Sequence, residues 1–155
     1  MRLIATLALV AAVAACHSRV ETNPSSGAVD VDISNQKKAG EDWGGALRGV
    51  GSFNGVSGQA TGREMNGVLT VNVTVQGLPP GGTHPWHVHE GKCADGGPIV
   101  GPPTSYPALR AGSDGRAAAT ANITVDLNEA RDYHVNVHLS PSSLGTIVAC
   151  GDFDD

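Results

Sequence analysis

Apolar and polar residues alternate along several stretches of this chain, most clearly over residues 68–77 (VLTVNVTVQG). One face of that stretch carries the apolar side chains of Leu69, Val71, Val73 and Val75, and the other face carries Thr70, Asn72, Thr74 and Gln76. A period of two is typical of a half-buried β-strand. Residues 116–125 (RAAATANITV) repeat the pattern after a turn signal at 113–115, with these side chains directed inward: Ala117, Ala119, Ala121, Ile123 and Val125.

Further stretches complete the expected secondary structure. Residues 131–140 (RDYHVNVHLS) and 145–151 (GTIVACG) predict strands, and residues 45–53 and 56–63 predict weaker strands interrupted by glycine. No long stretch has a helical period. Short strands joined by turns rich in Gly and Pro indicate an all-β fold, an antiparallel sandwich or barrel. Residues 91–111 carry no strand pattern, and a loop of that length tends to be functional or mobile.

The first residues (MRLIATLALVAAVAAC) are expected to direct export rather than to fold. Arg2 is followed by an apolar run too short for a membrane-spanning helix, which needs about 20 apolar residues. Residues 1–15 therefore predict a secretory signal peptide. Ala14 and Ala15 directly before Cys16 resemble a bacterial lipobox, which implies cleavage before Cys16 and lipid attachment to it. An ordinary signal peptide with a chance cysteine is the alternative.

Composition divides the rest of the chain into a tether and one domain. Residues 16–42 are poor in large apolar side chains and predict a flexible tether, although residues 28–33 (AVDVDI) alternate and could pair as an edge strand. Residues 43–155 suit a single domain with one core. The formal net charge is −5 and no basic cluster exists, so nucleic acid is not an expected partner. The sequence does not define an oligomeric state.

Export determines how the three cysteines are interpreted. If Cys16 carries lipid, Cys93 and Cys150 remain, and a pair of cysteines in an exported protein is most simply a disulfide. Such a bridge would tie the end of the domain to the loop behind the histidines, and the chain-entropy model values it at about 4 kcal/mol. Two free buried thiols, the alternative, do not suit an oxidising compartment.

Histidines on two predicted strands are the candidate chemistry. His87 and His89 share one face with Cα atoms about 6.5–7 Å apart, so their imidazoles can converge on one metal ion, while Trp86 and Val88 face the core. In residues 133–140 (YHVNVHLS), another face carries His134, Asn136 and His138. Three imidazoles suit zinc, copper, iron or nickel, and a tetragonal nitrogen set with an open position suits Cu(II). His134 is either a further ligand or, by preference, a surface histidine.

His84 has a different expected role. It lies in the turn before the strand, and its ring could donate a hydrogen bond to nearby backbone and so hold the ligand pair in place.

These residues resemble the copper/zinc superoxide dismutase family. The stretch GLPPGGTHPWHVHE resembles that family's metal-binding strand, SDGRA its hairpin, VNVH the strand of its last copper ligand and VACG the segment of its second cysteine. The resemblance covers residues 44–151 and implies a Greek-key antiparallel β-sandwich of the superoxide dismutase type. It implies that His87, His89 and His138 hold one copper ion, and that Cys93 and Cys150 form the disulfide. It also implies that His84 supports these ligands without binding the copper itself.

The chain departs from this family at several positions. No histidine lies between Cys93 and Asp114, and Ser105 stands near the place of the zinc aspartate, so no zinc site of the family type is expected. The copper site also lacks one of its four nitrogens, which His134, Asn136 or water would replace.

A second departure concerns the substrate. Ile147 stands where the family has its substrate-guiding arginine. Without that charge, superoxide would associate with the site about 10–1000-fold more slowly, unless Arg110 or Arg116 lies close to the histidines. Chordin-type domains carry similar motifs with a short linking loop like GGPIVGPP, residues 96–103.

Two functions follow as expectations. One is an exported, lipid-anchored, copper-binding dismutase-like protein acting on superoxide. The other is a non-catalytic copper-binding or chordin-type sandwich. A metal-free adhesion or scaffold module is the least favoured reading, because it would leave the histidines without a role. The membrane anchor would be the lipid on Cys16, on the periplasmic side of a bacterial membrane. The outer membrane is preferred, because His17 is not the aspartate associated with retention at the inner membrane.

Overall fold

The computed structural model of this protein describes residues 42–154, which form an all-β domain. The predicted signal peptide, the predicted lipid on Cys16 and all of the predicted tether except Asp42, which is the first residue of β1, lie outside these residues. The strands are β1 (Asp42–Gly49), β2 (Ser57–Met65), β3 (Val68–Gln76), β4 (Thr83–His84), β5 (Trp86–Glu90), β6 (Leu109–Arg110), β7 (Ala117–Thr124), β8 (Tyr133–His138) and β9 (Ile147–Asp152). Two 3-10 turns, η2 (Gly51–Phe53) and η3 (Pro103–Ser105), interrupt the connections. No helix in the described part of the chain is long and apolar enough to cross a membrane.

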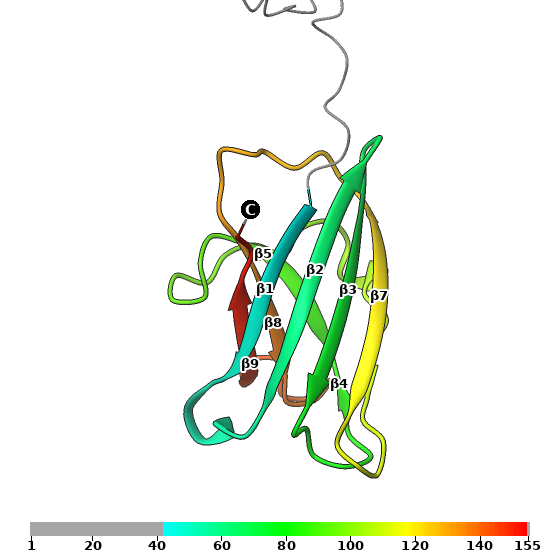
Figure 1. Ribbon diagram of the computed structural model, residues 1–155, viewed down its shortest axis with the longest axis vertical. Helices are drawn as coiled ribbons and strands as arrows, with labels where there is room; N and C mark the ends of the chain where they lie inside the picture. The colour runs from blue at the N-terminus through cyan, green and yellow to red at the C-terminus, as the bar shows by residue number, and fades with distance from the viewer. Residues whose placement is uncertain (1–41, 155) are drawn as a thin grey trace, which may run out of the picture. The chain divides into compact units, whose positions relative to one another are not determined.

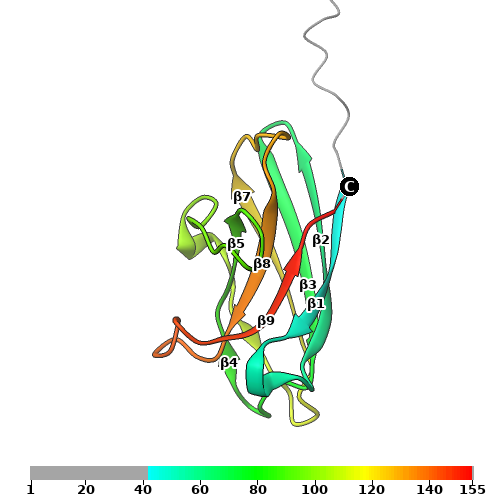
Figure 2. The same ribbon diagram turned by 90° about the vertical axis from the view of Figure 1, so that its left-hand side faces the viewer.

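Seven strands form one antiparallel sheet in the order β5-β8-β9-β1-β2-β3-β7, and β4 pairs with β6 separately. The regular pairing between β9 and β1 is short, joining Arg48 and Gly49 to Cys150 and Ala149, and just beyond β9 Gly44 and Asp154 exchange two backbone hydrogen bonds of 3.0 Å. The sheet curls at this link, so that β5, β8 and β9 lie opposite β1, β2, β3 and β7 (Figures 1 and 2). The result is a sandwich-like domain built from a single curled sheet.

Apolar side chains from both halves fill the space between them. The alternation predicted for β3 is confirmed, because Leu69, Val71 and Val73 are at most 1% exposed. In β7 the inward positions are buried or half-buried as predicted. In the other half of the sandwich, Trp86 of β5 pairs with Val137 of β8, and both are fully buried. The residues that alternate with them must therefore face away from the core, and these include the histidines.

The glycines that interrupt β1 and β2 permit close approach of backbones. A Cβ atom at Gly45 would overlap the carbonyl oxygen of Asp152, and one at Gly58 would overlap that of Thr74. These positions weaken the alternating pattern in the sequence because they carry no side chain, yet both segments pair as strands.

The long loop after β5 is tied to the sheet at several points. The Glu90 amide donates to Pro98 O at 3.0 Å, and the Val100 amide donates to Val88 O at 2.9 Å. The Tyr106 hydroxyl donates to Val100 O at 2.6 Å, while Trp86 Nε1 donates to Pro107 O at 2.8 Å. Residues 91–111, expected to be a loop without strands, also contain η3 and the short strand β6. The loop therefore lies against the free edge of β5.

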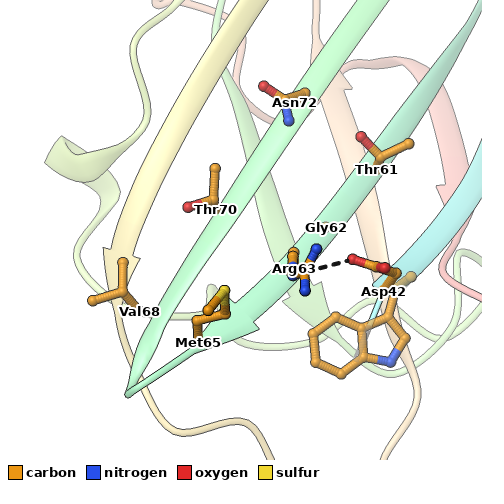
Figure 3. A pocket seen from close by; sticks show the side chains of 9 residues that line it. Asp42, Thr61, Gly62, Arg63, Met65, Val68, Thr70 and Asn72 are labelled. Atoms are coloured by element: carbon orange, nitrogen blue, oxygen red, sulfur yellow. Dashed lines mark ion pairs between the residues drawn. The ribbon is translucent and has the colours of Figure 1, made fainter. Parts of the chain in front are cut away.

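A shallow apolar hollow lies on the outer side of β1, β2 and β3 (Figure 3). Met65 and Val68 line it and are 50% and 38% exposed, and Arg63 pairs with Asp42 at its rim, with 3.6 Å between Nε and Oδ1. This surface belongs to the half of the sandwich that carries no histidine among the described residues.

Candidate metal centre

The histidines of β5 and β8 lie on the side of these strands that faces away from the core. In the antiparallel register His87 is opposite Asn136, and His89 is opposite His134. Despite this position the exposed fractions are small: 7% for His87, 9% for His89 and 6% for His138. The loop after β5 lies against this face, since its Gly97 and Gly91 carbonyls accept hydrogen bonds from His89 and His134. The three histidines therefore keep only a small contact with solvent.

His87, His89 and His138 come together, and one ring nitrogen of each lies within 4.8 Å of the others. His87 Nδ1 and His138 Nε2 are 3.3 Å apart. A shift in the β8–β9 register falls between Val137 and His138, so His138 pairs with Ile147. The residue passed over at this point is Val148, so the irregularity lies in β9. The amide of His138 is also held, since it donates to Pro85 O at 2.8 Å.

Backbone carbonyls orient two rings of this region. His89 Nδ1 donates to Gly97 O at 2.8 Å, so its unprotonated Nε2 is the nitrogen left to bind a metal. That Nε2 is buried and has no hydrogen-bond partner among residues 42–154. His84 is 1% exposed, and its Nδ1 donates to the carbonyl oxygen of His138 at 3.2 Å. His84 thereby ties the turn before β5 to the end of β8.

The environment keeps the three clustered rings neutral. Burial, followed by the neighbouring His138 and His89, lowers the pKa of His87 from 6.5 to about 4. Burial is also the largest cause that lowers the pKa of His89 and of His138, although a backbone carbonyl opposes it in each case. The neutral imidazole is the form that binds metals. Near neutral pH the site therefore presents lone pairs without first losing protons.

The interpretation of His134 as a surface residue is wrong. Its side chain is 0% exposed, and its ring stacks on that of His89 with centroids 5.2 Å apart. His134 Nδ1 donates to Gly91 O at 2.7 Å, and His134 Nε2 accepts from Asn136 Nδ2 at 3.1 Å. Both ring nitrogens are thus engaged within the protein, and His134 is not one of the three clustered histidines.

The predicted disulfide between Cys93 and Cys150 is present. Cys150 pairs with Asn136 in the β8–β9 register, which places the bridge beside the histidine face. The Cys93 amide also donates to Asp152 Oδ1 at 2.7 Å. The bridge therefore attaches the loop that supplies the Gly91 and Gly97 carbonyls to the strand next to β8.

Of the two arginines considered as replacements for the missing positive charge, Arg116 lies on the other half of the sandwich. Arg116 pairs with Asp114, 3.8 Å between Nε and Oδ2, and lies on the outer side of β2, β3 and β7. Arg110 is on β6, opposite Thr83. Ile147, the residue next to His138 in the register, carries no charge. Arg116 cannot steer an anion toward the histidines from the other half of the sandwich.

Tyr106 is a neighbour of the site that the sequence pattern did not single out. Its ring meets those of His87 and Trp86 edge-on, with centroids 5.2 Å apart in both pairs. Burial raises the pKa of Tyr106 to about 12, so the phenol remains protonated and donates to Val100 O. Because it lies in a loop without periodicity, only the tertiary structure reveals this contact.

No known protein-family model matches the chain, and no curated protein matches it either. The evidence for a function is therefore the histidine cluster and its surroundings.

Proposed function

We propose that this protein binds one copper ion through His87, His89 and His138. The observation that carries the proposal is the convergence of three imidazole nitrogens within 4.8 Å on a face that keeps the rings neutral. A nitrogen set of this kind, with one position open, is typical of copper sites, and Cu(II) is the divalent ion that such ligands bind most tightly. No thiolate competes in the described domain, because Cys93 and Cys150 are oxidised.

The wider setting of the proposal is an exported lipoprotein with a superoxide dismutase-type domain. The sandwich-like sheet, the disulfide and the three histidines support a Greek-key fold of that type and the resemblance to that family. The signal sequence and Cys16 support a lipid anchor on the periplasmic side of a bacterial membrane, with the outer membrane preferred.

Superoxide dismutation is the reaction this site suits best. When bound, copper would supply the one-electron chemistry that turns two superoxide ions and two protons into dioxygen and hydrogen peroxide. The protein's own part is to fix two of the ligands, His89 through the Gly97 carbonyl and His138 through the Pro85 carbonyl. The small exposed fractions of the three histidines, 6–9%, are the feature that favours a small substrate.

A non-catalytic copper-binding or chordin-type domain is the second candidate. It is favoured by Ile147 beside His138 and by the position of Arg116 on the other half of the sandwich. Neither Ile147 nor Arg116 supplies a positive charge beside the three histidines that would steer an anion toward them.

The first experiment is a Cu(II) titration of the chain from His17 onward, followed by electron paramagnetic resonance. We expect one copper per chain with a tetragonal nitrogen spectrum, lost in the His87→Ala/His138→Ala double variant. Thr74→Ala, an exposed position of β3, is the matched control and should bind as the unmodified chain does. Copper binding that survives the double variant would refute the site. A superoxide assay on the loaded chain then separates the enzyme from the non-catalytic domain.

A further inference from the structure

We propose that the side-chain oxygen of Asn136 is the fourth ligand of the copper site, and that His134 is the residue that positions it. This inference rests on the proposed copper site and goes beyond it, because it names the donor that completes three imidazoles. It also gives a role to His134, whose two ring nitrogens are both hydrogen-bonded within the protein.

Asn136 lies at the centre of the histidine face. On β8 it is two residues from His134 on one side and two from His138 on the other, and alternation puts all three on the same face. Across the strands it pairs with His87 on β5 and Cys150 on β9. Directly opposed residues on a sheet have Cβ atoms about 4.5–5.5 Å apart, so Asn136 is an immediate neighbour of His87. It is 3% exposed.

A chain of two hydrogen bonds sets the orientation of the amide. Gly91 O can only accept, so the nitrogen 2.7 Å from it, His134 Nδ1, carries the proton. His134 Nε2 is then an acceptor, and it takes a hydrogen bond from Asn136 Nδ2 at 3.1 Å. The opposite orientation of the amide would set its oxygen against a lone pair. His134 therefore selects the orientation in which the oxygen points away from His134, and the next residue on this face of β8 is His138.

The oxygen selected in this way is unpaired. Asn136 Oδ1 is buried and has no hydrogen-bond partner within residues 42–154. A buried polar atom without a partner costs about 1–3 kcal/mol, so such atoms call for an explanation. A cation held by the neighbouring histidines would satisfy this one. Three imidazoles and one amide oxygen also form a donor set that Cu(II) accepts.

His134 itself is the weaker choice for the fourth position. Binding a metal through Nε2 would remove the acceptor of Asn136 Nδ2 and leave a buried amide with neither of its groups paired. The geometry instead gives His134 a positioning role through the amide, comparable to residues that orient ligands in other metal sites.

The test uses the copper-loaded full chain and two readouts other than activity. In Asn136→Leu we expect Cu(II) affinity to fall about 10–100-fold, the range for disturbed metal-site partners. We also expect pulsed electron paramagnetic resonance in D2O to show a strongly coupled equatorial water that the unmodified chain lacks. Asn72→Leu, on the exposed face of β3, is the matched control and should change neither readout.

A second pair of variants tests the positioning role. His134→Leu, which removes the acceptor, should reproduce the new water signal of Asn136→Leu, whereas His134→Gln, whose amide oxygen can accept from Asn136 Nδ2, should restore the original spectrum. The number of coordinated nitrogens should stay at three in every variant. Asn136→Asp keeps the oxygen and the side-chain shape; it should retain copper and lower the midpoint potential, because the added negative charge favours Cu(II).

Several results would overturn the inference while leaving the copper site intact. An Asn136→Leu spectrum and affinity identical to those of the unmodified chain would show that the oxygen is not a ligand. Loss of a fourth nitrogen in His134→Leu would assign that position to His134. Loss of copper from Asn136→Asp to the same degree as from Asn136→Leu would contradict oxygen ligation. A different result would refute the copper site itself: the His87→Ala/His138→Ala variant would still bind copper.

Discussion

Removing the Cys93–Cys150 disulfide should strongly destabilise the metal-free domain. The bridge joins residues 57 apart in the chain, and the entropy lost by closing a loop of that length in the unfolded state corresponds to about 4 kcal/mol. Domains of this size have unfolding free energies of about 5–15 kcal/mol, so the loss is a large share of the total. It corresponds to a fall in melting temperature of roughly 15–30 °C.

The perturbation is the Cys93→Ala/Cys150→Ala double variant, which leaves no free thiol in the described domain. Urea unfolding of the metal-free chain, followed by circular dichroism, gives the free energy and its denaturant dependence together. We expect a smaller free energy of unfolding and a steeper denaturant dependence, because the unbridged unfolded chain exposes more surface. Ser113→Ala, in an exposed turn, serves as control. A loss below about 1 kcal/mol would refute the chain-entropy reasoning.

The remaining predictions concern the histidine face. Because the folded state holds the pKa of His87 at about 4 against 6.5 ordinarily, the unfolded chain binds more protons between these values. The free energy of unfolding of the metal-free domain should therefore reach its maximum above pH 6.5 and fall toward pH 4, with His87 alone contributing about 3 kcal/mol. Urea midpoints that stay constant across this pH range would contradict the prediction. Gly97→Ala should weaken copper binding about 10–100-fold, because the new Cβ would overlap the carbonyl oxygen of Glu90 and displace the Gly97 carbonyl that holds His89. A Cu(II) titration measures the affinity, and Gly145→Ala, at a position open to solvent, is the control. His84→Leu should lower the melting temperature and broaden the Cu(II) resonance, because the turn is no longer tied to the His138 carbonyl; an unchanged resonance would assign His84 no part in the site.

Local pattern was enough to locate the main strands. The alternation of β3 and β7 shows directly which residues are buried, because a strand repeats every two residues and one of its faces meets the core. The same rule places His87 and His89 on one face of β5 without any knowledge of the rest of the chain. The glycine-interrupted strands were harder to recognise, since the residue that permits close contact at Gly45 leaves no apolar side chain in the pattern.

The sequence by itself determined the all-β class, the sheet faces and the residue types that can bind a metal, because these depend on neighbours within a few positions. Only the tertiary structure decided which histidines meet. His138, at the end of β8, meets His87 and His89, whereas His134, on the same face, is held by the Gly91 carbonyl and by Asn136. Register and loop position arise from contacts between residues far apart in the chain. No local sequence pattern depends on those contacts. The burial of the histidine face and the unpaired oxygen of Asn136 could therefore be learned only from the tertiary structure.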